Sequence, residues 1–392
     1  MQQTSPAGAA PAPAATAVAA LVVGECATAL WQVDPVERLR RELAARGVRD
    51  LRRDPAELPH PTGRVVVLRT DFVFDPILVR ALLETPGLAL LATDADEVAG
   101  ANVEAGSAAG VAAAIAAGRL TGAAARGLGL TPRAPAEASG AYRDALRKRE
   151  TPYLLRASGD RRTLERRLFG GAYKGVTDAV TKYLWPEPAF WATQACVRLG
   201  LTPNMVTFAS LLLVGAAFYW FAAGQFALGL VAAWLMTFLD TVDGKLARVT
   251  VTHTKFGNVF DHGIDLLHPP FWYWAWMLGL QATGAAPPDA LAMLAVIVGG
   301  YVLQRVEEGV FIARHRFELH VWQRFDSLFR LVTARRNPNL VILTAALLAG
   351  RPDLGFAAVA WWTAICLAVH LVRLLQAEAA RRVRPPRSWL DR

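Results

Sequence analysis

The sequence predicts a two-part molecule, in which an N-terminal α/β domain precedes an all-α bundle of six transmembrane helices. The chain has 392 residues, which favours more than one domain. Hydrophobic residues make up 54% and charged residues only 19%, a balance too apolar for an ordinary soluble or disordered chain. The longest apolar segments all lie in the second half of the chain, so that half is the predicted membrane part.

The first 165 residues have the pattern of a soluble domain. Residues 1–20 are rich in Ala and Pro and are expected to be disordered. In residues 21–165, short apolar runs at 65–68 and 88–93 alternate with Arg-bearing helical stretches such as 35–48. Short buried strands between helices predict an α/β domain with a mainly parallel sheet.

Residues 166–392 form the predicted membrane domain. No charged residue lies between Asn204 and Asp240, a stretch that fits two helices turning near Gly224 and Gln225. Four more apolar segments complete the expected six spans, at 266–280, 290–303, 339–350 and 356–372.

Charge placement predicts the orientation of these spans. Lys and Arg gather before the first span, in alternate loops and after the last span, while the opposite loops hold only Asp289, Arg351 and Asp353. Because Lys and Arg stay on the cytoplasmic side, both termini are expected in the cytoplasm, at a bacterial inner membrane. This distribution also accounts for the net charge of +9, so nucleic-acid binding is not expected.

An acidic pattern occupies the predicted second and third spans. Its first half is Asp240, Asp243, Gly244, Ala247 and Arg248, and its second half is Gly257, Asp261 and Asp265. Helical spacing places each half on one face of its helix, so a short turn brings four carboxylates together at the cytoplasmic end. Such a cluster at the edge of the hydrocarbon is costly unless a cation binds there.

The residue types predict the ligands of this cluster. Ligation by carboxylates alone, with no cysteine nearby, favours Mg²⁺ or Mn²⁺ over zinc, and Mg²⁺ usually shares its shell with substrate phosphates. Gly244 and Gly257 leave space for a nucleotide or diphosphate near the backbone. Arg248 is placed to neutralise phosphate oxygens.

The pattern of eight positions at fixed spacing resembles the signature of the CDP-alcohol phosphatidyltransferase family, and Thr202-Pro203-Asn204 resembles that family's entry to its first helix. The resemblance implies that an acceptor hydroxyl attacks the β-phosphorus of a CDP-alcohol and releases CMP. It implies three metal ligands, Asp240, Asp243 and Asp261, with Asp265 as general base and contact to a second metal. Gly244, Ala247 and Arg248 would line the CDP site.

The resemblance also implies the partners. CDP-diacylglycerol is the expected donor, with another CDP-alcohol left open, and a homodimer in membrane lipid is expected. Glycerol phosphate, inositol phosphate and serine stay open as acceptors. Arg305 and Arg373, with Lys245 and Lys255 behind them, are the candidates for acceptor binding; the alternative is that they are ordinary snorkelling residues.

Residues 64–75 resemble part of the nucleotidyltransferase (GT-A-like) fold, in which an Asp such as Asp71 after a buried strand holds the metal. That family has a Gly-rich basic loop after its first strand, whereas the corresponding stretch VVGECATALWQ has one Gly and neither Lys nor Arg. A degenerate relative with a regulatory, nucleotide-binding or scaffold role is therefore expected. Two alternatives stay open: a bifunctional enzyme that also makes the CDP-alcohol from CTP, and a non-enzymatic cation-binding membrane scaffold.

Overall fold

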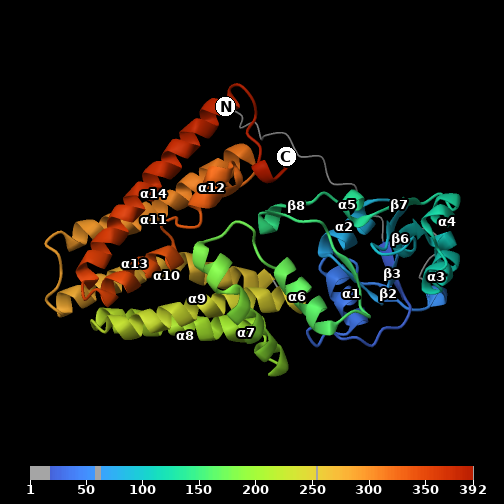
Figure 1. The fold of residues 1–392 in the computed structure, drawn as a ribbon, viewed down its shortest axis with the longest axis horizontal. Coiled ribbons are helices and arrows are strands. Elements are labelled where there is room, and N and C mark those ends of the chain that lie inside the picture. The colour runs from blue at the N-terminus through green and yellow to red at the C-terminus, as the bar shows by residue number, and fades with distance from the viewer. Residues whose placement is uncertain (1–17, 58–62, 253–254, 392) are drawn as a thin grey trace, which may run out of the picture. The chain divides into compact units, whose positions relative to one another are not determined.

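The computed structural model describes residues 18–57, 63–252 and 255–391 and divides the chain into two compact units (Figure 1). Unit 1 runs to Ala141 and includes Glu150–Glu165, and unit 2 contains Tyr142–Arg149 and the chain from Arg166 onward. Residues 1–20 are expected to be disordered, and residues 1–17 lie outside the described part of the chain. Residues 18–20 begin the first strand, so the expectation is wrong for them.

Unit 1 is built on a six-stranded sheet of order β2-β1-β3-β6-β5-β7. The strands are β1 (Val18–Val23), β2 (Leu51–Arg52), β3 (Arg64–Arg69), β5 (Leu88–Leu91), β6 (Val98–Glu104) and β7 (Thr131–Arg133). The expectation of a mainly parallel sheet needs correction, because β6 runs antiparallel to both β3 and β5. The connection from β5 to β6 is only residues 92–97, which is too short for the crossover of a dozen or more residues that parallel neighbours need.

Helices cover both faces of this sheet, which confirms the α/β class (Figure 1). The helices are α1 (Pro35–Ala44), α2 (Pro76–Glu84), α3 (Ala108–Ala116), α4 (Gly122–Gly127) and α5 (Pro135–Ala138). Because side chains alternate along a strand, Val66 and Leu68 of β3 pack with α1 and α2, while Val65 and Val67 pack with α3. A separate pair, β4 (Phe72–Phe74) and β10 (Leu154–Arg156), is antiparallel.

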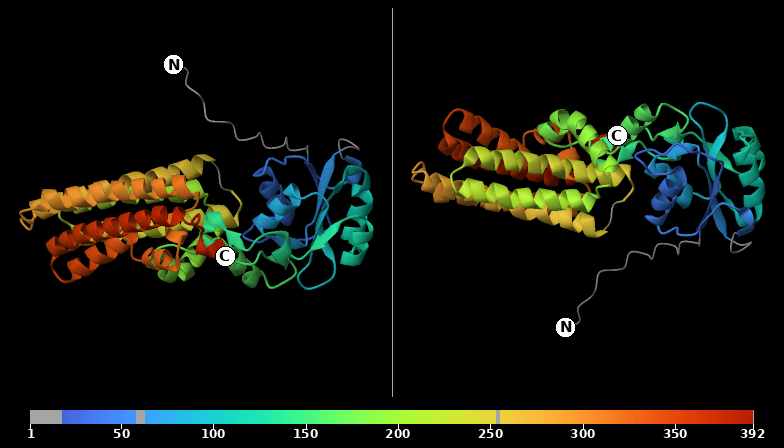
Figure 2. Two further views of the ribbon diagram at one scale, coloured as in Figure 1. Left: turned by 90° about the horizontal axis from the view of Figure 1, so that it is seen from above. Right: turned by 90° about the horizontal axis from the view of Figure 1, so that it is seen from below.

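Unit 2 is largely helical, and its long helices run side by side (Figure 2). The long helices are α8 (Pro203–Ala222), α9 (Phe226–Val249), α10 (Lys255–Ala282), α11 (Ala290–His315) and α14 (Pro352–Arg381). The shorter helices are α7 (Pro186–Arg198), α12 (Arg324–Phe329) and α13 (Arg336–Leu348). Helix α6 (Arg161–Gly171) precedes them, and β8 (Tyr142–Arg143) and β9 (Lys148–Arg149) form an antiparallel hairpin. The predicted turn at Gly224 and Gln225 is confirmed, since it separates α8 from α9.

Four described helices are long and apolar enough to cross a membrane, namely α8, α9, α11 and α14, and they indicate a membrane protein. The expected count of six spans is not confirmed. Helix α13 has 13 residues and is therefore about 20 Å long, short of the roughly 30 Å of a hydrocarbon core. Helix α10 carries the second half of the acidic pattern and contains Pro269 and Pro270.

The core of unit 2 joins α8, α9, α10, α13 and α14. Trp276 of α10 is fully buried, lies 5.0 Å from the Phe221 ring and 4.6 Å from the Phe226 ring, and donates to the Pro352 carbonyl. Helices α8 and α10 approach closely, because a Cβ at Gly279 would lie 2.0 Å from the Phe221 oxygen. This tight packing fixes the helices that carry the acidic pattern.

Candidate active site

Both halves of the acidic pattern lie where the sequence predicts them, on consecutive helices. Residues 240–248 form the last turns of α9, and Gly257 and Asp265 lie on α10. The side chains of Asp261 and Lys255 lie outside the described part of the structure.

Arg336, the first residue of α13, joins the two halves of the pattern. Its guanidinium donates to the Asp240 carboxylate and, over 2.5 Å, to Oδ1 of Asp265. Two carboxylates from different helices therefore face one positive charge. Sequence reasoning missed Arg336 because it lies in a basic loop that topology already explained, although its position at the start of a helix was a usable signal.

Asp243 is the most deeply buried described carboxylate of the pattern, with 3% of the residue exposed. Its Oδ2 accepts a hydrogen bond of 2.7 Å from Thr207 of α8, a residue that sequence reasoning also missed. Its Oδ1 is buried and has no hydrogen-bond donor among the described residues. A buried oxygen without a partner is costly and is suited to a cation.

The donor set fits a divalent ion. Asp240, Asp243 and Asp265 offer only carboxylate oxygens, the ligands that Mg²⁺ and Mn²⁺ prefer, and Asp243 has an oxygen to spare. No three Asp, Glu, His or Cys side chains in the described ranges come close enough to hold a metal as they stand. Arg336 supplies the positive charge between two of these carboxylates.

The predicted nucleotide residues of α9 lie at its polar end. Gly244 and Ala247 are half-buried and Arg248 is exposed. Arg248 donates 3.2 Å to the Gly244 carbonyl and 3.5 Å to the Ala172 carbonyl. A Cβ at Gly244 would lie 3.6 Å from Arg248 Nη1, so the arginine passes directly over the glycine.

The predicted acceptor residues are held by different partners. Lys245 is buried, donates to the Ala172 carbonyl and lies 3.8 Å from the centre of the Tyr173 ring. Arg305 pairs with Glu308 at 3.3 Å. Arg373 donates 2.6 Å and 2.9 Å to the two carboxylate oxygens of Asp326, and this contact ties α14 to α12.

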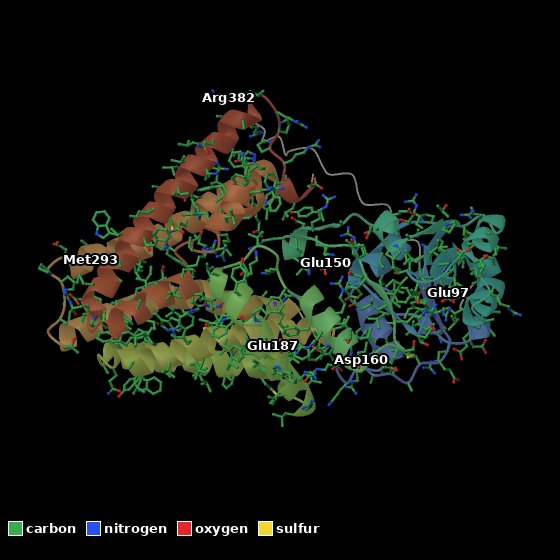
Figure 3. All side chains as sticks on the ribbon, viewed as in Figure 1. Glu97, Glu150, Asp160, Glu187, Met293 and Arg382 are labelled. Carbon is green, nitrogen blue, oxygen red and sulfur yellow. The ribbon has the colours of Figure 1, made fainter. Side chains whose placement is uncertain are left out.

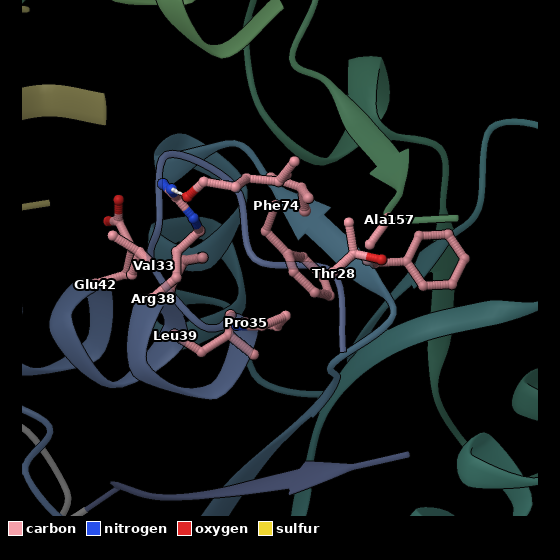
Figure 4. Close-up of a pocket in the computed structure, with 12 residues that line it drawn as sticks. Thr28, Val33, Pro35, Arg38, Leu39, Glu42, Phe74 and Ala157 are labelled. Carbon is pink, nitrogen blue, oxygen red and sulfur yellow. Dashed lines mark hydrogen bonds between the residues drawn. The ribbon is translucent and has the colours of Figure 1, made fainter. Parts of the chain in front are cut away.

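Unit 1 neutralises its own acidic residues. Arg69 donates to both carboxylate oxygens of Asp71, at 2.8 Å and 2.5 Å. Arg69 and Arg156 both pair with Glu97, which is labelled in Figure 3. A small pocket of unit 1 is lined by Thr28, Leu30, Val33, Pro35, Arg38, Leu39, Glu42, Phe72, Val73, Phe74, Val79 and Ala157 (Figure 4). The lining is mostly apolar, and Arg38 donates 2.9 Å to the Leu30 carbonyl.

The likeness of unit 1 to nucleotidyltransferases remains a prediction.

Four apolar helices in the described residues, together with the cluster of Asp240, Asp265 and Arg336, indicate a membrane protein with charged side chains at the polar end of α9. Residues 200–333, about a third of the chain, match the family model for CDP-alcohol phosphatidyltransferase.

Two curated relatives match part of the chain. A phosphatidylinositol phosphate synthase of Mycobacteroides abscessus is 32% identical over 119 residues, which are 29% of this chain and 54% of the relative. An archaetidylinositol phosphate synthase of Pyrococcus horikoshii is 40% identical over 70 residues, which are 18% of this chain and 37% of the relative. The chain thus spans about half or less of the length of these relatives.

Proposed function

We propose that the protein is an integral-membrane CDP-alcohol phosphotransferase of phospholipid biosynthesis. It moves a phosphatidyl or other phospho-alcohol group from a CDP-alcohol to an acceptor hydroxyl and releases CMP. The observation that carries the proposal is the complete eight-position pattern inside the family-matched region, with Asp240 and Asp265 facing a single cation.

The residues divide the chemistry among them. Mg²⁺ or Mn²⁺ held by Asp240, Asp243, Asp261 and Asp265 would neutralise the diphosphate and the charge on departing CMP. Arg248, at the exposed end of α9, binds phosphate oxygens beside Gly244, and Gly257 faces the nucleotide from α10. Asp265, whose side chain is 40% exposed, takes the proton of the acceptor hydroxyl.

For the substrates, we propose CDP-diacylglycerol as donor and an inositol phosphate as acceptor. The support is that the names of both relatives describe an inositol phosphate product. Arg305 is the strongest of the four acceptor candidates, because its Nε is buried without an acceptor among the described residues even though its Nη1 pairs with Glu308. Both carboxylate oxygens of Asp326 already engage Arg373. A homodimer in a bacterial inner membrane, with both termini cytoplasmic, completes the proposal.

The test follows CMP release from purified protein in nanodiscs with CDP-diacylglycerol, Mg²⁺ and inositol 1-phosphate. Asp265→Asn should lower turnover by about 100-fold or more while CDP binding is retained, because Asn cannot accept the proton whereas the other three carboxylates can still hold the metal. Asp353→Asn, in the first turn of α14, is the matched control. Turnover near wild type in Asp265→Asn would show that another group is the base.

The alternative of a second, CTP-dependent activity in unit 1 has less support. Asp71 is fully engaged by Arg69, and the stretch after β1 has neither Lys nor Arg for a triphosphate. Release of pyrophosphate from CTP and an alcohol phosphate by the full-length protein would favour the bifunctional alternative. No CMP release with any donor or acceptor would favour the scaffold alternative.

A further inference from the structure

A group of cationic side chains in unit 2 lies outside the eight-position pattern. Its members are Arg147 in the β8–β9 hairpin, Lys174 in the segment after α6, and Arg330 directly after α12. Backbone hydrogen bonds hold their segments together, since the Gly175 amide donates 2.8 Å to the Leu146 carbonyl and the Ala179 amide donates 2.9 Å to the Leu331 carbonyl. The charges of Arg147 and Arg330 both act on Lys174. Three segments that are distant in the sequence therefore bring positive charge to one place.

Arg330 is the most unusual member of this group. It is a buried residue, with 9% exposed, and its Nε and Nη1 atoms have no hydrogen-bond acceptor among the described residues. It forms no ion pair within 4.0 Å in that part of the chain. A guanidinium buried without an acceptor is costly, and proteins rarely retain one unless a ligand or partner completes it.

The acidic neighbours offset only part of this positive charge. Asp178 faces the charge of Arg330 without forming an ion pair with it, and Glu318 pairs with Arg147 at 2.6 Å. Arg248 adds a further positive charge close to Lys174. Burial, together with the charges of Arg147 and Arg248, lowers the pKa of Lys174 to about 8, which is the direction that excess positive charge produces.

We propose that Lys174 and Arg330, flanked by Arg147, bind a phosphate group carried by a phosphomonoester, either a soluble molecule or a lipid headgroup. A phosphate dianion offers several strong acceptors and two negative charges, which match the free guanidinium nitrogens and the excess charge. The proposed metal ligands and the four acceptor candidates are not members of this site, so it goes beyond the proposed function.

The experiment measures thermal unfolding of the full-length protein in phosphatidylcholine nanodiscs while inorganic phosphate replaces chloride at constant ionic strength. Phosphate should raise the Tm of the wild type, since a ligand of the folded state stabilises it by mass action. Lys174→Gln and Arg330→Lys should each weaken the apparent phosphate affinity by about tenfold, because a charge-assisted contact is lost or altered. Arg330→Lys is used in place of Arg330→Gln because it keeps the buried positive charge and is therefore more compatible with folding.

Arg384→Gln, which removes the same charge from the exposed C-terminal segment, is the matched control and should respond to phosphate like the wild type. An identical phosphate response in the wild type and Lys174→Gln, or no response beyond that to chloride, would overturn the proposal.

Two further arms identify the source of the phosphate. Saturation by soluble phenyl phosphate, which is not a proposed acceptor, supports a soluble phosphomonoester. A rise in Tm only in nanodiscs that contain phosphatidic acid supports a lipid headgroup. Neither arm uses a CDP-alcohol, and Asp265→Asn should retain phosphate binding. Failure of the phosphate site is therefore distinguishable from failure of the proposed activity.

Discussion

At the scale of single residues, Arg336 shows what the sequence can and cannot predict. The spacing of Asp240, Asp243 and Asp265 predicts that carboxylates converge on a cation, and the contacts of Arg336 agree for two of them. Arg336 lies 71 residues after Asp265 in the sequence, and no local sequence pattern links the two positions. Periodicity therefore predicts which side chains share a helix face, but it does not predict the partner that a third helix supplies.

Arg336→Gln should make the protein more dependent on divalent metal. Removal of one partner from a largely buried ion pair should destabilise the metal-free protein by about 2–4 kcal/mol. Added Mg²⁺ should then raise Tm about twofold more than in the wild type, because the carboxylates no longer have a competing cation. Differential scanning calorimetry with and without Mg²⁺ measures both effects. Arg335→Gln, which loses a pair with Glu308 instead, should show the wild-type response to Mg²⁺; the same gain in both variants would contradict this role.

Lys174 should give the protein a measurable pH dependence. Burial first, then the nearby cations, lowers its pKa from 10.5 to about 8, so between these pH values the folded protein binds fewer protons on Lys174 than the unfolded chain does. The free energy of unfolding should therefore fall as the pH is lowered from 10.5 through 8, by about 1–2 kcal/mol after allowance for solvent screening.

Unfolding of Lys174→Gln across this pH range should show a flatter profile, while Lys182→Gln, at an exposed lysine, should keep the wild-type slope. Parallel profiles for wild type and Lys174→Gln would exclude a depressed pKa at this residue.

At the scale of elements, the β8–β9 hairpin holds the segment that contacts the end of α9. Lys148 donates 2.8 Å to the Gly171 carbonyl, and the Gly175 amide donates 2.8 Å to the Leu146 carbonyl. The Ala172 carbonyl in turn accepts from Lys245 and Arg248. The β8–β9 hairpin, which lies outside the family-matched region, thus holds the segment around Ala172, and this segment positions Arg248, the proposed nucleotide-binding arginine.

Gly175→Ala should disturb this support. A Cβ at Gly175 would lie 2.6 Å from Lys148 Cβ and 2.7 Å from the Arg147 carbonyl, so the hairpin must move. The expected result is a rise in KM for the CDP-alcohol of about three- to tenfold, from misplacement of Arg248 by a fraction of an ångström, with a smaller change in kcat. Gly170→Ala, inside α6 with no atom within 4 Å of the new Cβ, is the matched control. A change confined to Tm, with KM unaltered, would limit the hairpin to a structural role.

The elements also show which physical signals the sequence holds. Apolar runs and helical spacing predicted β3, β5, the α8–α9 turn and the placement of the pattern on α9 and α10. The antiparallel direction of β6 follows from the length of its connection to β5, residues 92–97, and apolar runs alone do not indicate strand direction. The hairpin at 142–149 has no apolar alternation, and its membership in unit 2 depends on contacts between residues far apart in the chain.

At the scale of the whole molecule, the distribution of Lys and Arg in the sequence predicts one orientation in the membrane. The segment after α14 carries Arg382, Arg384 and Arg387, whereas the turn between α10 and α11 has only Asp289 near it. Transfer of several arginines across a bilayer is far less favourable than transfer of a nearly neutral turn. The C-terminal segment should therefore lie on the cytoplasmic side and residues near 285 on the opposite side.

Labelling of single cysteines in intact spheroplasts tests this orientation. In a background in which Cys26 and Cys196 are replaced by Ala, Ala285→Cys should react with a membrane-impermeant maleimide before lysis. Arg384→Cys should react only after lysis, because both positions are exposed in the folded protein and only the membrane separates them. The buried Cys366 stays unreactive in the folded protein and gives the background. Reaction of Arg384→Cys in intact spheroplasts would place the basic segment outside, and the proposed metal and phosphate sites would then face away from cytoplasmic substrates.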